Sequence, residues 1–376
     1  MKAAQTLINF KASINIACND NLTPIDTASS NGHYSVVDLL LKEGVKVNRK
    51  DKKKRTALHR AIENGHIDTV ILLLENKADI NQADKDGTKA IHEACSRGHL
   101  GIVERLLKYN DMINDRDNND RTPLFIASES NHIDIVNMLL RYKANVNQTN
   151  KEHMTPLYKA CQIGNVKIVG SLLDESAKVN VQSKDGFTPL YIACLEGCLN
   201  VVEILLNKKA EVNLATKQGW TPFLISCSED RLEICKLLLH NGANINTGDI
   251  SALTPLHVAC RENHERIVRF LLDNNATVNA VDRRNVSPLH IGCMNKCFDI
   301  VELLLNHHAD VNLCDINGNS PLHVACLKEN KQIVNLLLDK KADILKQNNE
   351  GKTPYDVVQG REKETIIEML NRYKEK

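Results

Sequence analysis

Cysteine is the residue type in this sequence that could support metal or redox chemistry. The chain holds 12 cysteines, and seven of them recur at multiples of 33 residues. These are Cys95, Cys161, Cys194, Cys227, Cys260, Cys293 and Cys326. Equivalent residues of stacked helical units lie about 8–10 Å apart, whereas a disulfide needs Cα atoms within about 7 Å. We therefore interpret this column as small buried residues of a repeated core rather than as a metal or redox ladder.

The remaining cysteine spacings and the histidines point the same way. Cys194/Cys198 and Cys293/Cys297 are i, i+4 pairs, but each pair would straddle a helix end and supply only two thiolates, whereas zinc needs four ligands, or three and a water. Two histidine columns follow the same period: His59, His92, His257, His290 and His323, and His33, His66, His99, His132 and His264. A catalytic triad pairs one histidine with one nucleophile, so we expect these repeating histidines to be structural.

One short motif imitates a nucleotide-binding loop. Gly351-Lys352-Thr353 resembles the end of a phosphate loop, but the glycine that such a loop requires five residues earlier is Lys346. The sequence contains no G-x-G-x-x-G, G-x-S-x-G or H-E-x-x-H motif. We predict that the chain is not an enzyme, with no catalytic residue, no cofactor and no metal.

The elements that position these residues follow one period. Every proline lies in a single register: Pro24, Pro123, Pro156, Pro189, Pro222, Pro255, Pro288, Pro321 and Pro354. The step is 33 residues throughout, and Ala57 and Ala90 hold the two skipped positions. A β-branched residue followed by Asn keeps the same step, from Ile14-Asn15 to Val311-Asn312. The pattern predicts one array of about eleven units rather than several globular domains.

Each unit is expected to contain two short helices. In the unit Ser183 to Ala215, Thr188-Pro189 is typical of a helix start, because Thr caps free backbone N–H groups and Pro suits the first helical position. Leu190, Ala193 and Cys194 then mark a buried stripe, and Gly197 ends this helix. A second helix carries Val201, Val202, Leu205 and Leu206 at helical spacing. Such short helices are unstable alone, so neighbouring units must cover one another's apolar faces.

These columns resemble the ankyrin repeat over essentially the whole chain. The helix-start signature appears as Thr254-Pro255-Leu256-His257, and with Ser first at Ser287-Pro288-Leu289-His290 and Ser320-Pro321-Leu322-His323. The unit Asp84 to Arg116 also carries Gly87, His92, Ala94 and Gly98-His99. The resemblance implies an all-α dominated repeat solenoid, with a helix-turn-helix and a projecting β-hairpin loop in each unit. It also implies a curved ankyrin stack whose concave side, made of first helices and hairpin tips, binds partner proteins.

The sequence departs from that pattern at several places. Thr56-Ala57 and Lys89-Ala90 weaken two helix starts, and Phe125, Tyr158, Tyr191 and Leu224 replace the usual His, either for packing or to alter the concave surface. Met1 aligns with Tyr34 of the next unit, so the chain opens in mid-repeat and suggests a fragment of a longer protein. We expect a partial N-terminal repeat over residues 1–20, the array over 21–348, and a C-terminal capping repeat over 349–376.

Composition narrows the partners. The formal net charge is +1 and aromatic residues make up 4% of the chain, so we expect no general attraction to nucleic acid and a core of Leu, Ile, Val and Ala. The sequence has no apolar run long enough to insert into a membrane and no signal peptide. We expect a monomer inside the cell, in the cytoplasm, with the nucleus as the alternative. The basic run Arg49 to Arg55 is interpreted as a solvated loop, with an import signal or a contact for an acidic partner as alternatives.

A cluster of apolar residues in the central units is the main functional signal. In ankyrin proteins, partner contacts fall on hairpin tips and on the exposed end of the first helix. The matching positions here are Met154, Ile163, Phe187, Leu195, Trp220, Leu253, Val286, Met294 and Leu327. The positions nearer the N-terminus are polar, among them Arg55, Glu63, Lys85, Arg97 and Glu129. Exposed apolar clusters mark binding sites, although packing between hairpins is the alternative.

The sequence therefore favours a noncatalytic adaptor that binds a protein or peptide partner through the concave face of the stack. Trp220, the single Trp of the chain, is its expected anchor. A second hypothesis is a targeting or regulatory arm of a larger enzyme or channel, and a third is a mechanical spacer in which no single groove residue matters. Because one fold serves many functions, the sequence leaves the identity of the partner open.

Overall fold

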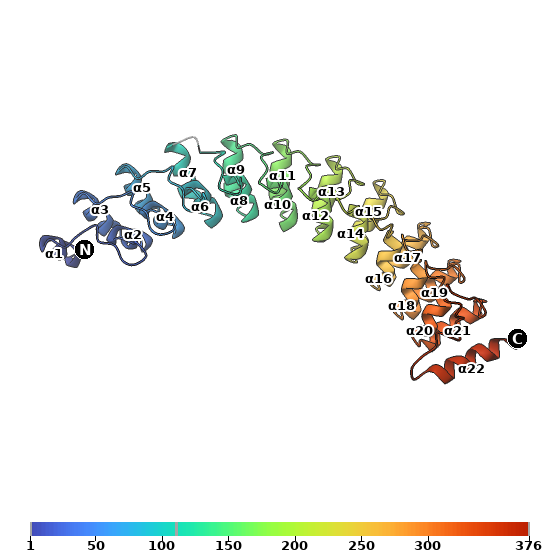
Figure 1. Cartoon of the computed structure of the whole chain (residues 1–376). Coiled ribbons are helices and arrows are strands. Elements are labelled where there is room, and N and C mark those ends of the chain that lie inside the picture. The colour runs from blue at the N-terminus through green and yellow to red at the C-terminus, as the bar shows by residue number, and fades with distance from the viewer. Residues whose placement is uncertain (1, 110–111, 375–376) are drawn as a thin grey trace. The chain divides into compact units, whose positions relative to one another are not determined.

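The structure is a computed structural model that describes residues 2–109 and 112–374. In these ranges the chain forms 22 α-helices and no β-strand (Figure 1). The helices group into two compact units, Met1–Lys184 and Asp185–Lys376. Each unit is a stack of helix pairs, as the resemblance to a repeat solenoid predicts.

In the first unit, helix α1 (Lys2–Asn9) precedes five helix pairs. The first helices of these pairs are α2 (Pro24–Ser30), α4 (Ala57–Glu63), α6 (Ala90–Arg97), α8 (Pro123–Glu129) and α10 (Pro156–Ile163). The second helices are α3 (Tyr34–Lys42), α5 (Ile67–Glu75), α7 (Leu100–Tyr109), α9 (Ile133–Arg141) and α11 (Val166–Asp174). First helices pack against neighbouring first helices, and each second helix packs on the first helix of its own pair.

The second unit repeats this arrangement and adds a C-terminal helix. Its first helices are α12 (Pro189–Leu195), α14 (Pro222–Ser228), α16 (Pro255–Arg261), α18 (Pro288–Met294) and α20 (Pro321–Leu327). Its second helices are α13 (Leu199–Asn207), α15 (Leu232–His240), α17 (Glu265–Asp273), α19 (Phe298–Asn306) and α21 (Lys331–Asp339), and α22 (Lys363–Lys374) packs on α21.

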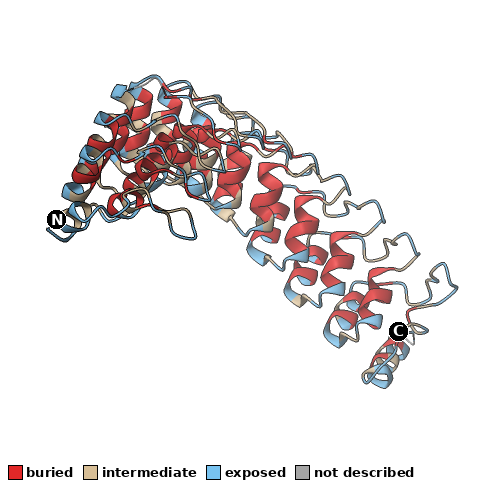
Figure 2. Cartoon of the chain, turned by 60° about the vertical axis from the view of Figure 1, so that its left-hand side comes forward, coloured by how far each residue is buried: buried red, intermediate tan, exposed pale blue. Residues whose placement is uncertain are grey.

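The core is built from the expected stripe positions. Leu190, Ala193 and Cys194 of α12 are buried, as are Val202 and Leu205 of α13. Figure 2 shows buried residues on the facing sides of the helices, whereas exposed residues lie on the outer turns and tips. Each helix is too short to be stable in isolation, so burial between neighbours supplies the stability of the stack.

The first helices begin in two ways, depending on the residue three positions after the cap. In the repeats with His, the ring accepts hydrogen bonds from the cap: His257 Nδ1 lies 3.2 Å from Thr254 N and 2.8 Å from Thr254 Oγ1. In the repeats without His, the threonine hydroxyl instead accepts from the backbone, as in the 3.1 Å bond from Leu224 N to Thr221 Oγ1. Both arrangements satisfy free N–H groups at a helix start.

The replacements for His therefore serve packing rather than the surface. Phe125, Tyr158, Tyr191 and Leu224 are all buried. The two weak helix starts also form, because His92 Nδ1 accepts a 3.1 Å bond from Lys89 N, and His59 Nδ1 accepts a 3.2 Å bond from Thr56 N. A ring acceptor thus compensates for the missing proline.

Histidines also join neighbouring repeats, which supports their structural interpretation. His257 Nε2 donates to Val286 O at 3.0 Å, and His264 Nε2 donates to Ser228 O at 2.9 Å. The first bond connects a first helix to the following tip, and the second connects an interhelix turn to the preceding one. Both histidine columns act as hydrogen-bonding staples between units.

The predicted hairpin loop is a tight turn rather than a pair of strands. Asp249 N donates to Leu253 O at 3.2 Å, and Asp249 Oδ1 accepts from Ser251 N and Leu253 N at 2.8 and 3.0 Å. Consecutive tips are joined by one backbone bond, such as the 3.1 Å bond from Ile250 N to Gln218 O. A single closing bond and a single bond to each neighbour are too few to form a strand ladder.

The Asn column links neighbouring repeats below the tips. Asn213 Oδ1 accepts from Asn244 N at 2.9 Å, and Asn213 Nδ2 donates to Gly242 O at 3.0 Å. We predict that Asn213→Ala lowers the free energy of unfolding by about 1–3 kcal/mol, because each lost bond contributes about 0.5–1.5 kcal/mol. Urea unfolding measured against Asn200→Ala, an exposed helical position, tests this. Equal effects of the two substitutions would contradict it.

The C-terminal segment departs from the repeat pattern. Thr353 and Pro354 open a turn rather than an α-helix, while Ile366 and Leu370 of α22 are buried. The division into residues 1–20, 21–348 and 349–376 stays a proposal, and Met1, Glu375 and Lys376 lie outside the described residues.

Candidate partner-binding surface

The predicted site residues lie at two places in their repeats. Met154, Phe187, Trp220, Leu253 and Val286 directly precede the cap of a first helix, whereas Ile163, Leu195, Met294 and Leu327 are the last residues of first helices. None of the nine is buried: the tip residues and Leu195 are half-buried, and Ile163, Met294 and Leu327 are exposed. Met154 and Ile163 belong to the first unit and the other seven to the second, so only those seven are described as one surface.

Phe187 and Trp220 meet at a pocket between two tips of the second unit. The pocket has a volume of about 450 Å³ and is lined by Asp185, Phe187, Tyr191, Thr216, Lys217, Gln218, Trp220 and Ile225. Tyr191 and Ile225 are only 5% and 6% exposed, so they form its floor, whereas Phe187 and Trp220 keep accessible surface. The pocket is therefore an open apolar hollow with three aromatic rings.

Part of this surface is internal packing, which was the alternative interpretation. The rings of Phe187 and Tyr191 have centroids 5.1 Å apart and planes inclined by 40°. Phe187 thus rests on the first helix of its own repeat while its remaining face contributes to the pocket. Sequence reasoning missed Tyr191 and Ile225 as lining residues, although the i, i+4 spacing of Phe187 and Tyr191 was a usable signal for the ring pair.

The backbone holds the Trp220 tip in place. Thr216 Oγ1 accepts from Trp220 N at 3.1 Å, and Thr216 N donates to Trp220 O at 3.0 Å. Gly219 has φ of +80°, and a Cβ there would lie 2.8 Å from Ile250 N. Glycine therefore permits both the left-handed turn and the close approach of the next tip, so the pocket wall is fixed from two sides.

A family model for ankyrin repeats, built on three copies, matches residues 1–84, 79–150, 142–216, 211–282, 242–315 and 289–372. The chain belongs to the ankyrin repeat family. Comparison with curated proteins gives no match. Ankyrin repeats generally mediate protein–protein interaction and are typically noncatalytic. In the described part of the chain, none of the helices of this ankyrin array has the length and apolar character needed to cross a bilayer.

The corresponding surface of the first ankyrin unit is charged and internally paired. Arg55 and Arg97 contact Glu63 at 2.9 and 3.3 Å, and Arg121 and Lys159 contact Glu129 at 3.2 and 3.1 Å. These pairs join neighbouring repeats and use the charges that a partner would otherwise contact. The polar residues expected toward the N-terminus therefore form ion pairs within the array.

The basic run Arg49 to Arg55 forms part of a folded tip. Arg49 Nη1 donates to Asn15 O at 2.8 Å, and Asp51 Oδ1 accepts from Lys53 N and Arg55 N at 2.7 and 2.8 Å. Burial raises the pKa of Asp51, but these bonds and Arg60 outweigh it and leave the pKa below its ordinary value. The run thus holds a fixed turn whose lysine side chains point to solvent, and a role in import or in acidic contacts stays a prediction.

The cysteine column is buried in the ankyrin core. All twelve cysteines are free thiols, and all seven members of the column are buried. Burial raises the pKa of the Cys326 thiol to about 12 and that of Cys95 further, so the thiolate form that reacts or binds metal is suppressed. Among the described residues, no group of three or more His, Cys, Asp or Glu side chains is placed to hold a metal.

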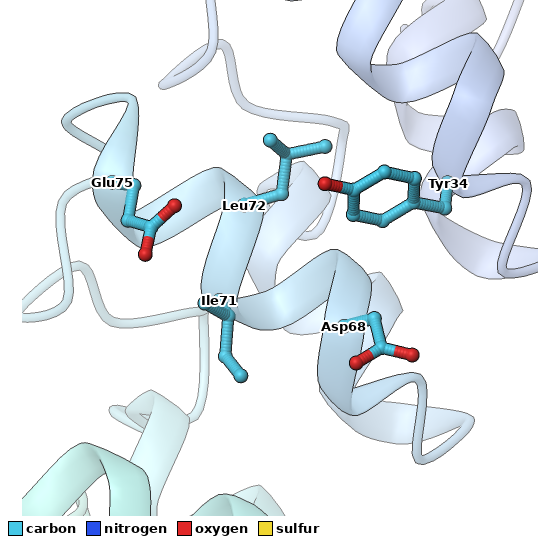
Figure 3. A pocket seen from close by; sticks show the side chains of 5 residues that line it. All are labelled: Tyr34, Asp68, Ile71, Leu72 and Glu75. Atoms are coloured by element: carbon cyan, nitrogen blue, oxygen red, sulfur yellow. The ribbon is translucent and has the colours of Figure 1, made fainter.

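A second hollow lies on the second helices of the first unit. It has a volume of about 270 Å³ and is lined by Tyr34, Asp68, Ile71, Leu72 and Glu75. Figure 3 shows Tyr34 reaching from α3 toward Leu72 of α5, with Asp68 and Glu75 apart from one another along α5. The two carboxylates are about two helical turns apart, so this hollow provides no paired acid and base.

Proposed function

We propose that this ankyrin chain is a noncatalytic adaptor that captures a protein or peptide partner on its second unit. The contact surface comprises the tip residues Phe187, Trp220, Leu253 and Val286 and the helix-end residues Leu195, Met294 and Leu327, with Met154 and Ile163 as further contacts on the first unit. In an ankyrin stack this surface corresponds to the concave face. The open pocket at Trp220 carries the proposal, because exposed aromatic pockets are typical binding anchors.

Two features support recognition over a purely mechanical role. The pocket walls are fixed by backbone bonds and by Gly219, so little conformational entropy is lost when a partner binds. The accessible aromatic surface also has no structural use beyond the Phe187–Tyr191 contact. A spacer would gain nothing from an open pocket of this kind.

Trp220→Ala is expected to weaken partner binding by about 2 kcal/mol or more, which is at least about thirty-fold. The intact chain and the variant are immobilised, and the proteins retained from a cell extract are quantified by mass spectrometry. Tyr142→Ala, at an exposed ring of the first unit, is the matched control. Helical circular dichroism verifies that both variants keep the fold. A retained set that is the same for Trp220→Ala and for the control would refute the proposal.

A further inference from the structure

We infer that the occupant of this surface is an acidic, extended segment in the polyproline II conformation, with an apolar side chain at every third position. This inference rests on the proposed function and adds the chemistry and the conformation of the partner. It is carried by the spacing of the tip residues, by the aromatic lining of the pocket, and by the unpaired charge beside it.

The tips set a fixed pitch. Phe187, Trp220, Leu253 and Val286 occupy equivalent positions in four consecutive repeats, 33 residues apart. Successive tips are locked by backbone bonds of 3.0 Å from Lys217 N to Asp185 O and 3.1 Å from Arg283 N to Ser251 O. Packed helices of neighbouring repeats lie about 8–10 Å apart. A partner must therefore place an apolar group at about that interval.

Polyproline II geometry meets this pitch. Its rise of about 3.1 Å and three residues per turn bring every third side chain to the same face after about 9 Å. A β-strand fails, because side chains three positions apart point to opposite faces. An α-helix covers the same distance only with every seventh residue, so most of its side chains would miss the tips.

The lining favours the extended partner. Phe187, Tyr191 and Trp220 together line one hollow of about 450 Å³. Aromatic-lined grooves are the surfaces on which polyproline II segments dock, since the segment is already ordered before it binds. One apolar side chain of the partner fits this hollow, and the next ones along meet Leu253 and Val286.

The charge beside the tips is positive and unpaired. Lys217, Arg283 and Arg284 are exposed, and within the described part of the chain none of the three forms an ion pair. The remaining residues at these two tip positions, from repeat 217 to repeat 317, are uncharged: Gln218, Ile250, Ser251, Ile316 and Asn317. Asp185 beside Lys217 is the one carboxylate lining the pocket.

The first unit provides the contrast for this charge argument. There, the equivalent Lys52 and Lys184 contact Asp20 and Glu152 at 3.8 and 3.3 Å. Tip cations that lack such partners attract acidic groups, which gives orientation and faster association. The acidic residues of the segment therefore face the tips, while its apolar residues face the helices.

The test uses synthetic peptides as probes of the full chain. The main probe is an acetylated, amidated peptide of four Leu-Pro-Asp triplets. Three comparison peptides carry Lys in place of Asp, Leu at every second position, or Leu at every seventh position of a helix-forming sequence. Trp220 is the only tryptophan, so its fluorescence reports occupancy of the pocket directly, and anisotropy of labelled peptides gives the affinities.

The Leu-Pro-Asp probe is expected to bind at least tenfold more tightly than each comparison peptide, with affinity that falls as salt rises. Lys217→Glu combined with Arg283→Glu should weaken it at least tenfold and favour the Lys peptide. Lys151→Glu, at the equivalent tip position of the first unit, should leave binding unchanged and serves as the matched control.

Three outcomes would overturn this inference. Tighter binding of the helical peptide would show that the pitch is matched by a helix, and equal binding of the Asp and Lys peptides would remove the charge argument. If no probe binds while Trp220→Ala still releases partners from an extract, the inference fails and the adaptor function stands. If Trp220→Ala releases nothing either, the proposed function itself fails.

Discussion

Replacing Leu256 with alanine is expected to lower the free energy of unfolding of the second unit by about 2–5 kcal/mol. Leu256 is 1% exposed and lies in α16, which packs on α14, α17 and α18. The substitution removes apolar contacts to three helices and leaves a cavity that the flanking helices only partly fill. Because each repeat depends on its neighbours, the loss should spread to adjacent repeats.

Urea unfolding followed by circular dichroism and by Trp220 fluorescence measures this effect. Trp220 lies one repeat before Leu256, so its transition should move to lower urea concentration together with that of the helical signal. Leu327→Ala is the matched control, because Leu327 ends an equivalent first helix and is 53% exposed. A control that destabilises as much as Leu256→Ala would show that the leucine stripe is not the core of the stack.

Lowering the pH from 7.5 to 5 is expected to destabilise the array through its capping histidines. Burial lowers the pKa of His59, His92, His257, His290 and His323 below the ordinary value. The unfolded chain takes up protons near pH 6.5 while the folded chain does not. Since the unfolded state then binds more protons, stability is highest above about pH 6.5 and is lost as the pH falls from there through the lowered folded values.

The hydrogen bonds explain why protonation opposes folding. His257 Nδ1 accepts from both Thr254 N and Thr254 Oγ1, so its proton must reside on Nε2, which donates to Val286 O. A second proton on Nδ1 would face two donors and break the cap. Carboxyl groups such as Asp51, with a lowered pKa, act only at more acidic pH.

The melting temperature of the full chain between pH 5 and 7.5 tests this expectation. The matched variant combines His257→Leu with His290→Leu, because Leu224 occupies the equivalent position in the native chain and its helix is capped by Thr221. The variant should show a weaker dependence on pH than the native protein. The same slope in both would assign the acid sensitivity to other groups.

Much of the fold could be predicted because the repeat expresses its physics locally. The Thr-Pro steps set the helix starts, and the stripe Leu190, Ala193 and Cys194 set the buried face, so both were confirmed by the structure. The two alternative caps were harder to foresee. Whether a threonine hydroxyl donates to a ring or accepts from the backbone depends on the residue three positions later, and a column of residue types does not distinguish the two.

The candidate site was only partly predictable for a different reason. Position in the repeat places Trp220 at a tip, but its accessibility depends on how its ring packs and on Tyr191 and Ile225 beneath it. Likewise, the pairing of Arg97 with Glu63 across 34 residues follows from stacking geometry, which a single repeat does not contain. Local patterns identify the elements, whereas contacts between repeats determine which side chains stay open.

The bonds between repeats all span nearly the same stretch of chain: 29 residues from His257 to Val286, 31 from Asn213 to Asn244, and 36 from Ser228 to His264. Each one therefore connects a repeat only with its immediate neighbour. Duplication or deletion of a whole 33-residue block leaves every such bond able to form again at the new junction, whereas a single inserted residue shifts the spacing of all bonds that cross it. Genetic recombination can thus lengthen or shorten this protein in whole repeats without the evolution of a new junction.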